Sequence, residues 1–145
     1  MKKIILLSIF TTFCFSQTEE WIYHNSLDGV SRVKPDGSEN ELLMGNVSIS
    51  DVSEDGNKLL LMGNPAPYTD TIYLINLESM DTLSITYVHE EYGPDQPSPL
   101  QPTLTYDENV ILFLNRESDG YESYNELWKY SFIDSSETVI ADWLD

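Results

Sequence analysis

The fold of this chain is decided by a ten-residue stretch that occurs twice, as Ser53-Glu54-Asp55-Gly56-Asn57-Lys58-Leu59-Leu60-Leu61-Met62 and as Thr105-Tyr106-Asp107-Glu108-Asn109-Val110-Ile111-Leu112-Phe113-Leu114. The second copy begins 52 residues after the first, so the pair is an internal repeat. Each copy is a polar turn that opens a strand, and each is followed by a strand with an aromatic centre, residues 72–75 and 127–130. Periods of this length with several strands per unit are typical of propeller blades.

Around this repeat, apolar runs bounded by Asp, Gly, Asn and Pro predict an all-β chain without a helix. The predicted strands fall into three groups. They are 21–25, 30–34 and 41–44 in the first group, 47–52, 58–62, 71–77 and 82–87 in the second, and 100–106, 110–115, 125–132 and 137–141 in the third. We therefore expect antiparallel four-stranded propeller blades at about 21–44, 47–87 and 100–141, the first of them without its innermost strand.

The strand patterns also predict where each strand lies in its blade. Residues 58–62 and 110–114 are apolar at consecutive positions, which requires cover on both faces, as for a strand between neighbouring blades. Residues 82–87 instead alternate strictly between polar and apolar, so one of their faces meets water. This alternation suits the outermost strand of a blade, whose edge is blunted by polar side chains.

The turns and the strands after them resemble the β-propeller repeat of the TolB type, with its Ser-Pro-Asp-Gly-like turn, apolar strand and Ile-Tyr or Leu-Tyr strand. Residues 53–56 and 106–108 occupy that turn, with Glu54 in place of the usual proline, and residues 33–38 are similar to the other common turn. The resemblance covers about residues 21–141. It implies a propeller fold and an exported protein that recognises another envelope or secreted protein, but such short motifs specify fold better than function.

The predicted blades are too few for a closed ring, which takes typically four to eight. Trp143 and Leu144 suggest the start of a further inner strand. Three explanations are open. They are a truncated reading frame, an open partial propeller, and closure of the ring by two or more copies of the chain, since unpaired blade faces would otherwise expose apolar patches.

The N-terminus carries the pattern of a secretory signal peptide, residues 1–16. Lys2 and Lys3 precede an apolar run of about 12 residues, too short to span a bilayer, and small residues Cys14 and Ser16 precede the predicted cleavage point after Ser16. The pattern predicts a periplasmic or secreted protein with no membrane span after cleavage. Cys14 also suggests acylation as a lipoprotein, which we do not expect because bulky Phe13 precedes it.

The chain is strongly acidic, with 25 acidic against seven basic residues and a net charge of −18. Cleavage after Ser16 removes two lysines and leaves five basic residues and a charge of −20. Such a charge repels nucleic acid and leaves cations, basic proteins or salt-rich surroundings as electrostatic partners. An acidic coat that keeps an exported protein soluble explains the charge as well.

The predicted loops sort by length onto the two ends of the blades. Loops after the first and third strands are tight, whereas the opposite end carries three long ones, at 63–70, 88–99 and 116–124. Long loops on a rigid scaffold concentrate binding residues, so this long-loop face is the predicted protein-binding surface. Its candidate contacts are Tyr68, His89, Tyr92, Tyr121 and Tyr124. The alternative interpretation is that prolines stiffen these connectors and the tyrosines cap the core.

No catalytic constellation is found in the sequence. The two histidines lack metal spacing, no serine lies in a Gly-x-Ser-x-Gly elbow, and no cofactor motif is present. Calcium is a weak candidate through loop carboxylates such as Asp119 and Glu122. We therefore expect a non-catalytic scaffold. The alternatives are an accessory propeller of a larger enzyme, such as a prolyl-oligopeptidase-like peptidase, or a carbohydrate- or calcium-binding propeller.

Overall fold

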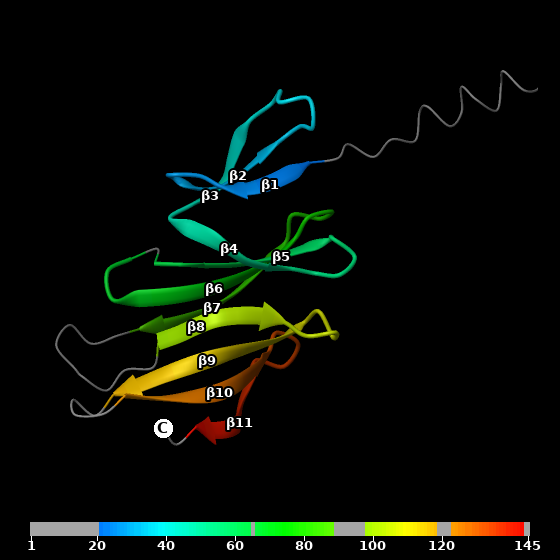
Figure 1. Ribbon diagram of the computed structural model, residues 1–145. Helices are drawn as coiled ribbons and strands as arrows, with labels where there is room; N and C mark the ends of the chain where they lie inside the picture. The colour runs from blue at the N-terminus through cyan, green and yellow to red at the C-terminus, as the bar shows by residue number, and fades with distance from the viewer. Residues whose placement is uncertain (1–20, 65, 89–97, 119–122, 144–145) are drawn as a thin grey trace, which may run out of the picture.

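The computed structural model describes residues 21–64, 66–88, 98–118 and 123–143 (Figure 1). These residues form eleven β-strands and no helix, which confirms the predicted all-β class. Within the described ranges there is accordingly no helix with the length and apolar character to cross a membrane. The predicted signal peptide, its cleavage point after Ser16 and Cys14 all lie outside the described residues.

Three antiparallel sheets follow one another along the chain, and we call them blades 1, 2 and 3. Blade 1 contains β1 (Ile22–Asn25), β2 (Gly29–Val33) and β3 (Glu41–Gly45). Blade 2 contains β4 (Val47–Val52), β5 (Lys58–Gly63), β6 (Thr69–Asn76) and β7 (Thr82–Val88). Blade 3 contains β8 (Ser98–Leu104), β9 (Val110–Ser118), β10 (Ser123–Ser131) and β11 (Ser136–Trp143). Every strand pairs with the next one in its blade, and the three sheets stack in chain order (Figure 1).

The predicted strands match the observed ones to within two residues at each end, except at the end of β9 in blade 3. There β9 and β10 continue pairing out to Ser118 and Ser123, so residues 116–118, 123 and 124 of the predicted loop 116–124 lie in strands. Its polar residues suggested a loop, but an antiparallel hairpin keeps pairing wherever both backbones stay extended. The prediction that Trp143 begins a new inner strand was also wrong. Its backbone pairs with Asn125, and Trp143 is the last residue of β11.

Two apolar cores hold the three blades together. The core between blades 1 and 2 contains Val30, Val47, Leu59, Leu61 and Ile75. The core between blades 2 and 3 contains Leu60, Ile72, Leu74, Ile111, Phe113 and Tyr130. Successive residues of β5 thus enter opposite cores, as the pleat of a strand requires. Residues 58–62 are covered on both sides of the sheet, as predicted.

The outer strand of blade 2, β7, also matches the sequence pattern. On β7, Ile85 and Tyr87 are half-buried against the core between blades 2 and 3, while Thr82, Ser84, Thr86 and Val88 on the other face are exposed. Leu83 shares the face of Ile85 but is 48 % exposed. One wet face marks β7 as the outer strand, as the alternation of residues 82–87 predicts.

On β9 of blade 3, by contrast, Ile111 and Phe113 are buried while Leu112 and Leu114 keep partial exposure, so cover is complete on one face only.

Candidate functional site

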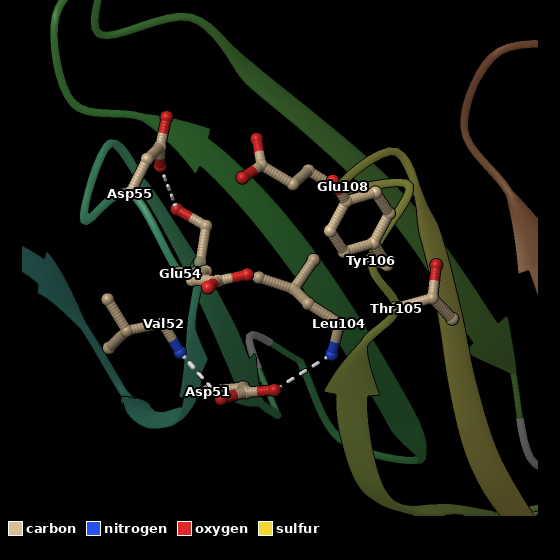
Figure 2. Close-up of a pocket in the computed structure, with 9 residues that line it drawn as sticks. Asp51, Val52, Glu54, Asp55, Leu104, Thr105, Tyr106 and Glu108 are labelled. Atoms are coloured by element: carbon tan, nitrogen blue, oxygen red, sulfur yellow. Dashed lines mark hydrogen bonds between the residues drawn. The ribbon is translucent and has the colours of Figure 1, made fainter.

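A pocket of about 630 Å³ lies where blades 2 and 3 meet, at the end of the molecule that carries the tight turns (Figure 2). It is formed by the end of β4 with the turn that follows, and by the equivalent segment after β8. Its lining residues are Asp51, Val52, Ser53, Glu54, Asp55, Leu104, Thr105, Tyr106 and Glu108. The two copies of the repeated stretch therefore supply the two walls of a single depression.

Asp51 fastens the floor of this pocket to blade 3. Its Oδ2 accepts a hydrogen bond from the Thr103 hydroxyl at 2.6 Å. The same oxygen accepts the Leu104 backbone N–H at 2.9 Å (Figure 2). Its Oδ1 accepts the Val52 backbone N–H at 2.8 Å. Partial burial tends to raise the pKa of Asp51, but the three donors outweigh it and hold the pKa below its ordinary value. Asp51 is thus an ionised structural residue.

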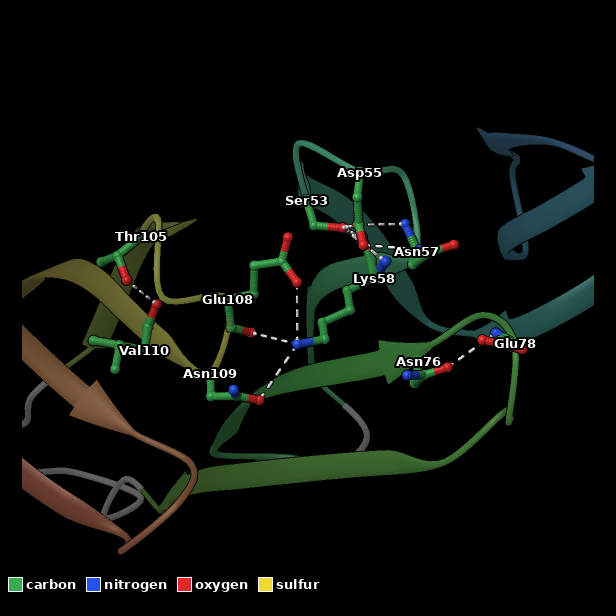
Figure 3. A network of polar contacts seen from close by, with 10 residues as sticks. All are labelled: Ser53, Asp55, Asn57, Lys58, Asn76, Glu78, Thr105, Glu108, Asn109 and Val110. Carbon is green, nitrogen blue, oxygen red and sulfur yellow. Dashed lines mark hydrogen bonds and ion pairs between the residues drawn. The ribbon is translucent and has the colours of Figure 1, made fainter.

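The first turn, residues 53–58, is organised by a second aspartate. Asp55 accepts the Asn57 backbone N–H at 2.9 Å, the Ser53 hydroxyl at 2.7 Å and the Asn57 side-chain amide at 2.8 Å (Figure 3). These donors, the Asn57 backbone first, lower the pKa of Asp55. Gly56 adopts a φ of 75°, which favours glycine. The predicted polar turn is therefore present, and its own Ser, Asp and Asn side chains stabilise it by hydrogen bonds.

Lys58 connects this turn to its counterpart in blade 3. Its Nζ lies 3.3 Å from a Glu108 carboxylate oxygen and also donates to the Glu108 carbonyl and the Asn109 side-chain oxygen, each at 3.4 Å (Figure 3). The contact fixes the two turns relative to each other. It also neutralises one of the four carboxylates that line the pocket.

The exposed residues of the lining include one aromatic residue and one acidic residue without a described partner. Tyr106 is 96 % exposed, and Glu54 is exposed with no hydrogen bond or ion pair to any described residue. An aromatic ring held in water on a fixed turn buries apolar area when a partner binds, and loses little conformational entropy. Because Asp51, Asp55 and Glu108 are engaged, Glu54 is the carboxylate at this site that is free to pair with a cation.

The pocket is lined mainly by acidic and hydroxyl-bearing side chains. Among the described residues, no group of three or more His, Cys, Asp or Glu is placed to hold a metal ion. The two pocket aspartates with resolved shifts, Asp51 and Asp55, have lowered pKa values, the opposite of what a general acid needs at neutral pH. The raised pKa of Tyr87 lies elsewhere, on β7, and is caused first by burial and then by its 2.9 Å hydrogen bond to Glu137.

A second depression, of about 500 Å³, lies on the long-loop face between blades 1 and 2. Leu27 stands fully exposed at its rim. Gly63 lets the backbones approach closely, because a Cβ there would stand 2.2 Å from the Asn46 carbonyl oxygen. The long-loop face therefore also offers a recess, though one with fewer charged groups in its lining.

The predicted binding residues fare unevenly. Tyr68 is half exposed, with a φ of 58°, in the turn before β6 on the long-loop face. His89, Tyr92, Tyr121 and the weak calcium candidates Asp119 and Glu122 lie outside the described residues. Tyr124 was assigned to a loop, but its backbone lies in β10, paired with Glu117. Of this group the structure describes Tyr68 and the backbone of Tyr124, so the grouping of the five residues stays a prediction.

Sequence reasoning missed the pocket at the tight-turn end. The tight turns were not predicted to bind a partner, because turn formation alone accounts for their Asp, Gly and Asn residues. The available signal was the repeat itself, since adjacent blades place equivalent turns side by side. Glu54 of one copy and Tyr106 of the other are exposed residues that this pairing brings to one pocket.

Strand order, blade stacking and core arrangement define the class of fold, three successive blades of a β-propeller. Comparison with solved structures supports that class. An oligogalacturonate lyase in complex with manganese matches with a TM-score of 0.54 and 15 % identity over 82 % of this chain. TolB from Acinetobacter baumannii matches with a TM-score of 0.50 and 12 % identity over 86 % of this chain.

The chain spans only 31 % of the length of each of these two proteins. At such identities the likeness concerns the fold alone. No protein-family model matches the chain, and no curated protein matches it.

Proposed function

We propose that this chain is an exported, non-catalytic propeller domain that binds another protein. The observation that carries the proposal is the pocket between the two repeated turns, where Tyr106 and Glu54 face solvent on a scaffold fixed by hydrogen bonds. Rigid presentation of an aromatic side chain beside an unpaired charge is typical of recognition surfaces. The signal-like residues 1–16 support a location in the periplasm or outside the cell.

The charge of the surface favours a basic partner segment. The pocket is lined by four carboxylates, of which the lysine contact offsets one, and the whole chain carries −18. An acidic surface attracts a lysine- or arginine-bearing polypeptide and weakens its hold as salt screens the charges. No described feature favours the enzyme-accessory, carbohydrate or calcium alternatives over this one.

Site-specific photocrosslinking tests the proposal in the cell that makes the protein. A photoreactive phenylalanine analogue at position 106 should give one covalent adduct of defined mass in the exported fraction. The same analogue at position 68 reports on the long-loop face in a matched experiment. Adducts from position 68 alone would move the binding surface to the long-loop face, and adducts from neither position would contradict the proposal.

Charge and export are checked separately. Glu54→Lys should reduce the yield of the adduct formed at position 106, and 0.5 M salt, an ionic strength at which the screening length is on the order of 4 Å, should reduce it further. The intact mass of the exported chain should correspond to a first residue Gln17 if cleavage follows Ser16. A mass that retains residues 1–16 would contradict the export prediction.

A further inference from the structure

We infer that a second copy of this chain docks head to tail on blade 3, and that its blade 1 covers the outward face of that blade. We call the face of a blade turned toward the next blade its trailing face, and the opposite one its leading face. Both interfaces inside the molecule are of one type, trailing face against leading face. The proposed contact repeats that type between chains.

The trailing face of blade 3 is equivalent by repeat to a face that is covered in blade 2. Leu60 lies fully buried against blade 3, and Leu112, which stands 52 residues later, is partly exposed. The neighbouring positions on the two faces also correspond. Met62 pairs with Ile72 in blade 2, and Leu114, 52 residues after Met62, pairs with Leu127 in blade 3. Leu112, Leu114 and Leu127 thus form the apolar centre of a blade face without its covering blade among the described residues.

The same chain carries an uncovered leading face on blade 1. The register places Ile22 beside Val33, and Ser31 beside Leu42, on the side away from blade 2. Ile22 is 50 % and Leu42 54 % exposed there. One unfilled trailing face and one unfilled leading face on each chain are the two halves of a heterologous interface, which generates rings or open filaments.

The distribution of charge favours another copy of this chain as the occupant. Although the sequence has 25 acidic residues, the paired positions on the trailing face of β9, β10 and β11 include no Asp or Glu, and Lys129 lies among them. The paired positions on the leading face of blade 1 include none either. Faces free of carboxylates are needed where the partner is as acidic as the chain itself, since buried like charges would repel.

Sedimentation velocity of the full chain over a concentration series tests the inference. The wild type is expected to form species of two or more chains, and to form them more readily at high salt because screening relieves the repulsion between acidic chains. Lys129→Glu, at an exposed position of the trailing face, and Leu42→Glu, on the leading face, should each raise the dissociation constant at least about tenfold. Ile133→Glu, 72 % exposed in the turn between β10 and β11, is the matched control and should change nothing.

Mixing the two impaired variants gives the decisive result. Each retains one intact face, so the mixture should form a dimer and nothing larger, whereas neither variant does so alone. Circular dichroism spectra equal to that of the wild type confirm that both variants are folded. A wild type that stays monomeric at on the order of 100 µM overturns the inference. So does assembly that survives both substitutions, or that depends on Lys129 but not on Leu42.

Discussion

The Thr103 hydroxyl donates to the Asp51 carboxylate at 2.6 Å, and the two residues are 52 positions apart, which is the spacing of the repeat. The Ser50 hydroxyl and the Pro102 carbonyl, also 52 apart, meet in the same way at 2.7 Å. Equivalent positions of adjacent blades therefore bond directly to each other. These two hydrogen bonds fix the inner strands β4 and β8 relative to each other, and the pocket lies just beyond the ends of the two strands.

Replacing Asp51 should weaken the junction of blades 2 and 3. In Asp51→Asn an amide NH2 group replaces one carboxylate oxygen and cannot accept the hydrogen bonds that this oxygen accepts. We therefore expect a loss of about 1–3 kcal/mol in the free energy of unfolding. Urea unfolding followed by circular dichroism measures it. Glu54→Gln is the matched control, because Glu54 has no described partner, and it should stay within about 0.5 kcal/mol of wild type. Equal losses in the two variants would contradict the assigned role.

The same carboxylate predicts a pH dependence. Asp36, Asp51, Asp55 and Asp134 all have lowered pKa values because nearby hydroxyl and backbone groups donate to them, which at Asp51 outweighs the opposing effect of burial. A lowered pKa in the folded state gives stability that is present above the unfolded value, here 3.8, and lost as the pH falls through the folded one.

The measurement is the difference in unfolding midpoint between wild type and Asp51→Asn from pH 6 downwards. This difference should be constant above about pH 5 and narrow below about pH 4, because the wild-type carboxyl then also becomes neutral. Protonation of the other carboxylates changes the unfolding midpoint of both proteins alike, so it cancels in the difference between them. A gap that persists unchanged at low pH would show that shape, not charge, sets the role of Asp51.

Much of this architecture is readable from the sequence, for local reasons. Leu59, Leu60 and Leu61 are consecutive and apolar, which requires cover on both faces, and the Asp55-Gly56 pair marks the turn that precedes them. What the residues do not reveal is where pairing stops, as at Ser118, or which turns become neighbours. The pocket depends on contacts such as that of Lys58 with Glu108, 50 residues away, which no local pattern encodes.

The two copies of the repeat should respond differently to the same truncation. Leu60 is fully buried in the core between blades 2 and 3, so Leu60→Ala should cost about 2–5 kcal/mol. Leu112 occupies the equivalent position with only partial burial, and Leu112→Ala should cost clearly less in the monomeric state. Urea unfolding at low protein concentration compares them directly. A larger loss at Leu112 would mean that the face is already covered.

Two glycines allow steric exclusion to be separated from backbone strain. Gly56 has a φ of 75° and open space where a Cβ would stand, so Gly56→Ala should cost only the left-handed penalty of about 1–2 kcal/mol. Gly63 carries no such strain, but an added Cβ would stand 2.2 Å from the Asn46 carbonyl oxygen and 2.7 Å from a Val47 methyl group. Since backbone must move to admit it, Gly63→Ala should be the more destabilising change and should loosen the connection between blades 1 and 2. Thermal unfolding of the two variants ranks them, and an order with Gly56→Ala as the worse would contradict the close approach of β5 to the segment that links β3 and β4.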